Sequence, residues 1–215
     1  MSLITKLISE KTLKTPAIIS AFKRIKRSDF MLPQNKDEAE SNHPLPIGSG
    51  QTISQPYTVA FMLELLGPKK KDKVLDVGSG SGWTTALLAE IVGADGHVFA
   101  IERIPELKKF GEANVKKYVP APNRTTEGSS GSCVQFLCSD GTKGLPEFSP
   151  FDKILISAAT PKIPKDLLDQ LKTGGRLTAP IGKSSQDIVV LDKISKKEYK
   201  EKRYPGFIFV PLISD

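Results

Sequence analysis

A glycine-rich stretch that follows a short apolar run has the residue types and spacing needed to bind a nucleotide. The run, residues 74–77, contains Asp76, and glycines follow at positions 78, 80 and 82. Glycine takes positive φ freely and lets a ligand approach the backbone closely. Residues 84–92 continue with helical apolar spacing, and the first turn of a helix offers unpaired N–H groups. We therefore predict a strand, a tight turn and a helix that together form a nucleotide-binding turn.

A second stretch with the composition of a binding loop lies directly ahead of this turn. Residues 44–56 read PLPIGSGQTISQP, and an apolar helix is predicted after them from Tyr57 to Leu66. Prolines restrict such a loop, while its glycines and hydroxyl residues supply hydrogen-bond donors. We interpret it as a rigid loop beside the nucleotide site. Ser54 has an alternative role as the N-cap of the helix that begins at Pro56.

The elements that must position these stretches alternate between strand and helix. Strands are predicted at 74–77, 96–101, 133–138, 154–157 and 177–181, with closing strands at 187–193 and 198–210. Helices are predicted at 84–92, 105–118 and 165–171, after two amphipathic helices at 2–11 and 17–27. Residues 30–46 and 120–131 are predicted to be polar loops. This pattern is typical of an α/β fold whose parallel sheet binds ligand at the carboxyl ends of its strands.

Two acidic residues end successive strands of the predicted sheet. Glu102 lies about 20 residues beyond the glycines, where an acid can accept hydrogen bonds from both ribose hydroxyls of a nucleotide. Asp140 follows the next strand and begins an Asp-Gly turn with Gly141. Each acid also has a structural alternative: Glu102 as a solvated strand end, and Asp140 as an Asx-turn residue.

The glycine turn resembles the first motif of the S-adenosylmethionine (AdoMet) methyltransferases with a seven-stranded sheet. A dinucleotide fingerprint would instead need glycine at position 83, which is Trp83. Residues 46–56, PIGSGQTISQP, resemble the signature of the protein-L-isoaspartate O-methyltransferases, and Val210-Pro211-Leu212 resembles that family's ending. The resemblance covers about residues 44–212. It implies a Rossmann-like, doubly wound, mostly parallel sheet in a methyltransferase domain at 47–215, preceded by N-terminal helices and a polar loop at 1–46.

The resemblance also implies which residues bind cofactor and which bind substrate. AdoMet, which leaves as S-adenosylhomocysteine, would be bound by Asp76, Gly78, Ser79, Gly80, Glu102, Arg103, Asp140 and Gly141. Asp140 would accept from the adenine amine. An isoaspartyl peptide would be bound by Ile47, Gly48, Ser49, Gly50, Thr52, Ile53 and Val210. Ser54 would be the active-site residue, either donating to the substrate carboxylate or fixing the loop.

The implied reaction is protein repair. The α-carboxyl of an isoaspartyl residue would be methylated, the ester would collapse to a succinimide, and hydrolysis would return part of the damage to aspartate. A carboxylate is already ionised at neutral pH, so this methylation needs no strong general base. The sequence agrees, because it has no Ser/His/Asp constellation. Positioning and electrostatics would supply the catalysis.

Composition limits the partners and the compartment. The net charge of +7 permits an acidic partner without requiring one. No apolar run approaches the ~20 residues of a membrane span, and the N-terminus lacks the apolar region of a signal peptide. Cys133, Cys138 and the two histidines have no metal-binding spacing. We therefore expect a soluble, cytoplasmic, monomeric protein without metal.

Two other functions compete with repair. A nucleic-acid methyltransferase would share the fold and suit the basic charge. Amino-group methylation of a flipped base usually needs a polar-Pro-Pro-aromatic turn after the fourth strand, where this chain has Ser157-Ala158-Ala159-Thr160-Pro161, so nucleic acid is disfavoured. A non-catalytic AdoMet-binding protein is disfavoured by Ser54 and Glu102. One departure from the repair family is Ser41-Asn42-His43, where its members often have Tyr-x-Asp, so substrate entry could differ.

Overall fold

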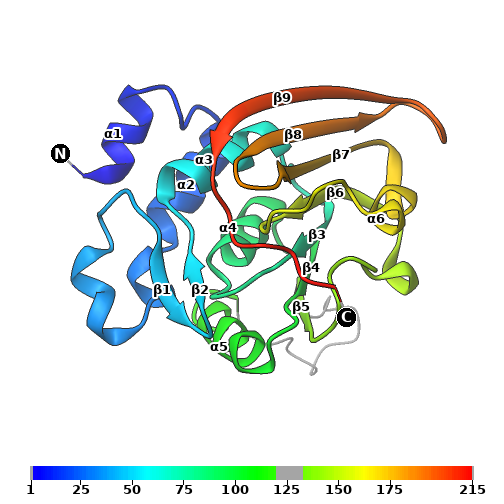
Figure 1. Cartoon of the computed structure of the whole chain (residues 1–215). Helices are drawn as coiled ribbons and strands as arrows, with labels where there is room; N and C mark the ends of the chain where they lie inside the picture. Colours follow the sequence, from blue (N-terminus) through cyan, green and yellow to red (C-terminus); the bar gives the residue numbers. More distant parts are fainter. Residues whose placement is uncertain (1, 120–132, 215) are drawn as a thin grey trace.

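The structure, a computed structural model that describes residues 2–119 and 133–214, is built around one seven-stranded sheet (Figure 1). In spatial order its strands are β5 (Val134–Leu137), β4 (His97–Ile101), β3 (Lys73–Val77), β6 (Phe151–Ile156), β7 (Leu171–Gly182), β8 (Gln186–Lys193) and β9 (Tyr199–Phe207). The strands from β5 to β7 are parallel, β8 runs antiparallel to β7, and β9 runs antiparallel to β8. The predicted fold class, a Rossmann-like and mostly parallel seven-stranded sheet, is confirmed.

The strand order reverses beside β3, which lies between β4 and β6. From β3 the chain first builds the sheet outward through β4 and β5, and then returns to the other side of β3 with β6. At such a switch point the loops leave the carboxyl ends of neighbouring strands in opposite directions and open a crevice. The glycine turn after β3 and the acid after β4 therefore meet at one edge of the sheet.

Helices cover both faces of the sheet. They are α1 (Leu3–Ser9), α2 (Pro16–Arg24), α3 (Pro56–Leu66), α4 (Trp83–Val92), α5 (Pro105–Val115) and α6 (Lys165–Gln170). Side chains of a strand alternate between its faces. In β3, Val74 joins the core cluster that contains residues of α1 to α5, whereas Leu75 and Val77 join the cluster that contains Leu167 of α6. Asp76, like Val74, therefore belongs to the face that α4 covers.

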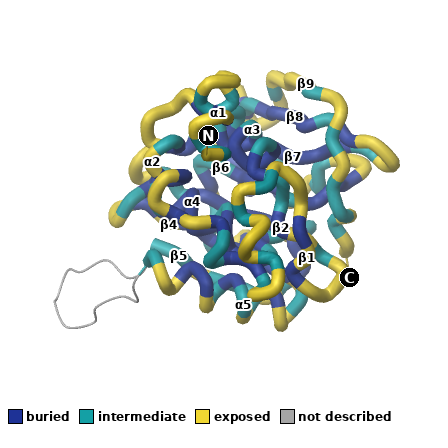
Figure 2. Tube along the Cα trace, turned by 90° about the vertical axis from the view of Figure 1, so that its left-hand side faces the viewer, coloured by how far each residue is buried: buried dark blue, intermediate teal, exposed yellow. Residues whose placement is uncertain are grey.

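The N-terminal helices share the larger core cluster with the rest of the molecule. Phe22 of α2 meets Trp83 of α4 edge-on, with ring centroids 5.6 Å apart, and both side chains are buried. Leu7 and Ile18 belong to the same cluster as Leu87. Figure 2 shows the buried residues concentrated in the sheet and in α4, with the exposed ones on the surrounding segments. The first helices thus pack into the same core as the sheet.

Several predicted loops have more structure than expected. The loop at 44–56 contains a two-stranded antiparallel hairpin, β1 (Leu45–Gly48) and β2 (Gln51–Ile53), because its apolar residues alternate and pair across the turn, as Leu45 does with Ile53. The polar stretch 30–46 includes the short 3-10 helix η2 (Pro33–Glu38), which follows η1 (Arg27–Phe30). The 120–131 loop lies outside the described residues. No helix in the described part of the chain is long and apolar enough to span a membrane.

The strand β9 forms one edge of the sheet. It pairs with β8 on one side only, and most of its residues, including 200–203, are exposed. The chain then leaves this edge and returns across the carboxyl ends of the central strands, where Figure 1 shows the last segment in red. The end of the chain is thus brought back to the switch point.

Candidate active site

The turn between β3 and α4 is carried by glycines. Gly78, Gly80 and Gly82 have φ values of +79°, +51° and +82°, a left-handed backbone that glycine adopts without strain. A Cβ on Gly82 would lie 2.7 Å from the carbonyl oxygen of Gly111. The backbone of α5 therefore presses directly against the turn. This contact requires glycine for space as well as for conformation.

Glu102, at the end of β4, is fixed against this turn. Its Oε2 accepts a hydrogen bond from the amide of Gly80 at 2.9 Å, and its Oε1 accepts from the amide of Ile104 at 3.0 Å. The side chain is buried, yet it borders the main cavity. A carboxylate has about four lone-pair sites, so each oxygen retains acceptor capacity for a hydroxyl group in the cavity. The alternative of a solvated strand-end acid is wrong.

Asp76 lies behind the turn, outside the residues that border the cavity. Its Oδ2 accepts a hydrogen bond from the hydroxyl of Thr85 in α4 at 2.6 Å, while Oδ1 has no partner among the described residues. The pKa of Asp76 is raised to about 6, chiefly by complete burial and to a smaller extent by the nearby charge of Glu102. The strand places this carboxylate on the α4 face. It therefore supports the start of α4 from beneath the turn.

The two residues of the Asp-Gly turn after β5 have different places: Asp140 holds the turn together, and Gly141 borders the main cavity. Asp140 is buried, and its Oδ1 accepts from the amide and the hydroxyl of Thr142 at 2.8 and 2.7 Å. This is the Asx-turn geometry that the sequence left open as an alternative. Gly141 borders the cavity, and a Cβ there would lie 2.5 Å from Cγ1 of Val77. Arg103, exposed beside Glu102, also borders the cavity.

The β1–β2 hairpin forms the opposite wall. Ile47, Thr52 and Ile53 border the cavity together with Ser54. The tip, which consists of Gly48, Ser49 and Gly50, lies outside the cavity and has positive φ at all three residues. A Cβ on Gly80 would lie 3.3 Å from Cδ1 of Ile47, so the hairpin packs closely on the glycine turn. Of the predicted substrate residues in this stretch, Ile47, Thr52 and Ile53 thus border the cavity, whereas residues 48–50 at the hairpin tip do not.

Ser54 connects the hairpin to α3. The N-cap residue of α3 is Gln55, so the alternative role of Ser54 as N-cap is wrong. Asn42 caps the helix from a distance, because its Oδ1 accepts from the amide of Tyr57 at 2.9 Å. The hydroxyl of Ser54 has no hydrogen bond to any described residue, whereas its carbonyl oxygen accepts one from Arg27 at 3.3 Å. The hydroxyl is therefore available to a ligand.

The last segment of the chain closes the site. The amide of Ala159 donates to the carbonyl oxygen of Val210, and the amide of Leu212 donates to the carbonyl oxygen of Ala159, both at 2.7 Å. The buried side chain of Gln186 accepts from the amide of Phe209 at 2.8 Å. Val210 borders the cavity, and the three residues that follow it do so as well.

Two cavities meet at Ser54. The main one, of about 120 Å³, is bordered by the glycine turn, Glu102 and the hairpin. The second, of about 290 Å³, is bordered by Pro44, Gln55, Thr58 and residues 208–209. Both are bordered by Thr52, Ser54, Ser157 and Val210. No group of His, Cys, Asp or Glu side chains suitable for a metal ion occurs among the described residues. Two ligands could therefore meet beside one serine hydroxyl.

Some residues that border or support the site were not predicted from the sequence. Trp83 reads as a packing residue, and it does pack in the core, but it also borders the main cavity. Ser157 and Ala158 border it because they follow β6, the strand next to β3, at the same edge of the sheet. Their position after a buried strand could have predicted this. Nothing in the lysine-rich surroundings of Arg27 indicated its contact with Ser54.

The fold and the site together define a class of protein. A mostly parallel sheet with a glycine turn after its central strand and a buried acid after the next is the Rossmann-like fold of the AdoMet-dependent methyltransferases. A candidate protein-L-isoaspartate O-methyltransferase from Plasmodium falciparum, solved in complex with S-adenosyl-L-homocysteine, has this fold. It superposes with a TM-score of 0.84 over 99% of this chain and 97% of its own, at 22% identity.

The family follows from closer relatives. The family model of protein-L-isoaspartate(D-aspartate) O-methyltransferase (PCMT) matches residues 1–215. Proteins named protein-L-isoaspartate O-methyltransferase from Methanopyrus kandleri and Thermococcus onnurineus are each 40% identical to this chain over 99% of its length and over 90% and 92% of their own. The chain belongs to the protein-L-isoaspartate(D-aspartate) O-methyltransferase family. The match includes the N-terminal helices, which the motifs at 44–212 left out.

Proposed function

We propose that this protein transfers a methyl group from AdoMet to the α-carboxyl of L-isoaspartyl residues in damaged proteins and peptides. The observation that carries the proposal is the position of Ser54 where the two cavities meet. One cavity has the glycine turn and the acid expected for a nucleoside, and the other is open toward the surface at Ile208, which is 85% exposed. Membership of the family supplies the substrate class.

The main cavity fits AdoMet in its donor set. Glu102 would accept hydrogen bonds from the ribose hydroxyls, with its orientation already set by the amide of Gly80. The hydroxyl of Ser79 borders the cavity and is buried without a hydrogen-bond partner among the described residues, so a polar ligand atom would satisfy it. Gly78, Arg103 and Gly141 would complete the binding surface. Asp76 and Asp140 would act from behind it, by holding α4 and the Asp-Gly turn.

Substrate would lie in the second cavity as an extended segment. Thr52 and Val210, which border both cavities, would flank the isoaspartyl residue, and the apolar side chains of Ile47 and Ile53 would keep water from the reacting atoms. The hairpin tip, residues 48–50, would contact the peptide beyond the cavity. Recognition through an exposed, flexible backbone would let the enzyme accept many damaged proteins.

The chemistry requires positioning more than proton transfer. Bound AdoMet, held by Glu102, Ser79 and the glycine turn, would supply a methyl group on a positively charged sulfur for transfer to a substrate carboxylate oxygen. The carboxylate is ionised at neutral pH, so no side chain needs to remove a proton. The hydroxyl of Ser54 would donate to the other carboxylate oxygen and hold it in line. The following backbone nitrogen would then bond to the ester carbonyl carbon as the methoxy group leaves as methanol with the proton of that nitrogen, which gives the succinimide.

The decisive experiment compares two peptides that differ only in an isoaspartyl or a normal aspartyl linkage, each mixed with methyl-labelled AdoMet. We expect base-labile label on the isoaspartyl peptide alone. Ser54→Ala should lower kcat by on the order of 10- to 100-fold, because one positioned donor is lost. Ser195→Ala, at an exposed serine between β8 and β9, is the control and should retain wild-type activity.

Two outcomes would contradict the proposal. No label on either peptide, despite measurable AdoMet binding, would exclude isoaspartyl repair. Label that appears on RNA instead would establish the nucleic-acid alternative that the basic charge permits.

We also propose that the enzyme acts as a monomer in the cytoplasm. Cys133 and Cys138 are free thiols, as expected of a protein kept in a reducing compartment. Light scattering at micromolar concentration should give the mass of a single 23.4 kDa chain, and a dimer mass would refute the monomer.

A further inference from the structure

Arg27 is a buried cation at the start of η1, between the N-terminal helices and the candidate active site. Its side chain is 6% exposed. Burial lowers the pKa of Arg27 to about 10, which still leaves the guanidinium charged at neutral pH. None of the described carboxylates lies within salt-bridge distance of it, and its Nε has no hydrogen-bond partner among the described residues. An arginine in this setting must be held by other groups.

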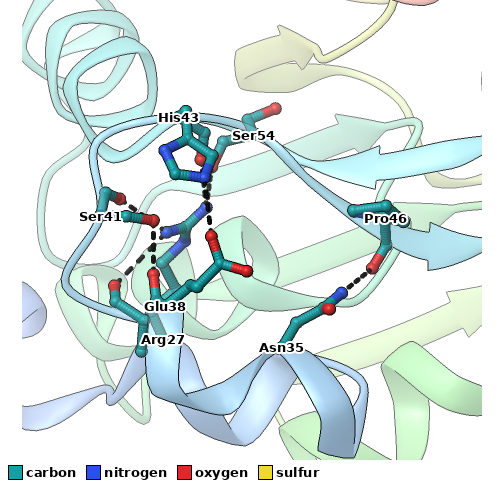
Figure 3. A network of polar contacts seen from close by, with 8 residues as sticks. Arg27, Asn35, Glu38, Ser41, His43, Pro46 and Ser54 are labelled. Atoms are coloured by element: carbon teal, nitrogen blue, oxygen red, sulfur yellow. Dashed lines mark hydrogen bonds and ion pairs between the residues drawn. The ribbon is translucent and has the colours of Figure 1, made fainter.

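Those groups are four backbone carbonyl oxygens from two separate segments. Nη1 donates to Ala39 and Ser41 at 3.3 and 2.9 Å, and Nη2 donates to His43 and Ser54 at 2.8 and 3.3 Å. Figure 3 shows the guanidinium between these segments, with the carbonyl of Ser54 turned toward it and the hydroxyl turned away. One planar cation therefore joins residues 39–43 to the backbone of Ser54.

The segment 39–43 has no regular backbone pairing of its own, because these residues belong to no helix or strand. Its carbonyl groups would otherwise be poorly satisfied, and a charged fork that donates hydrogen bonds to several of them fixes their directions. A second tie runs from Asn42 to the amide of Tyr57 in the first turn of α3. Residues 39–43 are thus tied to the backbone at Ser54 through Arg27, and to the backbone at Tyr57 through Asn42.

The same guanidinium also faces the cofactor side. It lies over the ring of Trp83, with its Cζ 5.7 Å from the ring centroid, and Trp83 borders the main cavity. Arg27 therefore contacts the walls of the site at two points, the backbone of Ser54 and the ring of Trp83, without bordering the main cavity itself.

We propose that Arg27 is a positioning residue for methyl transfer: its guanidinium, held by the carbonyls of residues 39–43, fixes the backbone of Ser54 so that the hydroxyl faces the junction of the two cavities. This inference rests on the proposed function, in which Ser54 binds the substrate carboxylate. Lysine cannot replace arginine here, because one ammonium group cannot span two segments as the planar fork does.

The test is a double-mutant cycle between Arg27→Lys and Ser54→Ala, assayed with the isoaspartyl peptide. In the wild-type background, Arg27→Lys should lower kcat by on the order of 10- to 100-fold, the usual effect of a small misplacement in an active site. In the Ser54→Ala background the same substitution should change kcat by less than about threefold, because two residues that act through one hydroxyl are not additive. Affinity for S-adenosylhomocysteine should stay within about threefold of wild type.

Controls separate positioning from a loss of folding. Arg24→Gln removes an exposed arginine of α2 that pairs with Glu90, and it should leave kcat unchanged. Asn42→Ala leaves Arg27 in place but releases residues 39–43 from α3, so it should also lower kcat, even if the Arg27 variants prove unstable. The fluorescence of Trp83, the single tryptophan, should shift in Arg27→Lys and not in Arg24→Gln.

Three results would overturn the proposal. The first is an equal loss of kcat from Arg27→Lys in both backgrounds, and the second is full activity of Arg27→Lys. The third is a loss of activity in Arg27→Lys that matches its loss of folded protein, together with a wild-type kcat in Asn42→Ala. An inactive wild-type protein would refute the proposed function itself, and with it the role of Arg27, whereas an active wild type with active Arg27 variants would refute only the role of Arg27.

Discussion

At the scale of single residues, Asp76 makes folding stability depend on pH. Its pKa is about 6 in the folded protein, against an ordinary value of 3.8. The folded state therefore holds this proton more tightly than the unfolded chain does. The stabilisation is complete below about pH 4 and is lost as the pH rises to about 6, by about 3 kcal/mol in total.

Asp76→Asn should abolish this dependence. Between pH 4 and pH 7 the free energy of unfolding of the wild type should fall by about 3 kcal/mol relative to that of Asp76→Asn, measured by urea denaturation. Thr85→Val, which removes the hydroxyl that lowers the pKa of Asp76, should extend the loss of stability to higher pH and enlarge its total. Parallel curves for wild type and Asp76→Asn would show that the carboxylate titrates alike in both states.

For single residues, the sequence predicted which types of side chain lie near the site better than it predicted where those side chains point. Glu102 lies at the cavity as expected, because the carboxyl end of a strand fixes its place. Asp76 is one residue before the end of β3, and strand alternation turns it toward α4. Arg27 gave no signal, because its partners are backbone carbonyls, which every residue has.

At the scale of elements, the contact between α5 and the glycine turn decides whether the cofactor cavity keeps its shape. A Cβ on Gly111 would lie 2.7 Å from the carbonyl oxygen of Gly80 and 3.2 Å from the amide nitrogen of Gly82. Backbone atoms cannot rotate away as a side chain can, so either α5 or the turn would have to move.

Gly111→Ala has two opposite effects on the free energy of unfolding: a gain from helix propensity and a loss from the clash with the turn. Propensity alone would stabilise α5 by about 1 kcal/mol. We expect the clash to prevail, with a net loss of about 1 to 3 kcal/mol in the free energy of unfolding. Binding of S-adenosylhomocysteine should weaken by on the order of tenfold in calorimetry, because Gly80 orients Glu102.

The exposed Ala113 of the same helix provides the matched control. Ala113→Gly should cost about 1 kcal/mol in stability through propensity alone and leave the affinity for S-adenosylhomocysteine unchanged. If Gly111→Ala bound the ligand as tightly as Ala113→Gly, the packing of α5 on the turn would have no influence on the cavity.

Elements were easier to predict than the connections between them. The strands and helices of the sheet follow from apolar periodicity, and α3 ends at Leu66 as predicted, before Gly67, whose φ is +59°. The hairpin at 45–53 was missed, since its strands are short and interrupted by proline and glycine. Its place beside the glycine turn depends on packing of Ile47 near Gly80, and these two residues lie far apart in sequence.

At the scale of the whole molecule, the N-terminal helices and the sheet share a core, so we expect them to unfold together. Phe22→Ala should lower the free energy of unfolding by about 3 to 5 kcal/mol, because it empties the space against Trp83. Tryptophan fluorescence and far-ultraviolet circular dichroism should report one coincident transition. Ile194→Ala, at a side chain that is 51% exposed, should change stability by less than about 0.5 kcal/mol.

The contrary result is a separate, earlier transition for the N-terminal helices. In that case Phe22→Ala would melt residues 1–46 while the sheet remained folded, and these residues would form an independent unit. The interface between α2 and α4 would then contribute little to the sheet.

The edge strand β9 has a consequence for a protein that handles extended chains. An unpaired strand offers a row of backbone groups on which another chain can add as a further strand. Here Lys200, Glu201, Lys202 and Arg203 cover that edge with exposed charge, and Pro205 removes one donor from it. Damaged polypeptides, or other copies of this protein, would gain little by adding to the sheet. The charge on this edge thus disfavours aggregation, because a flexible chain finds no uncharged strand there to pair with.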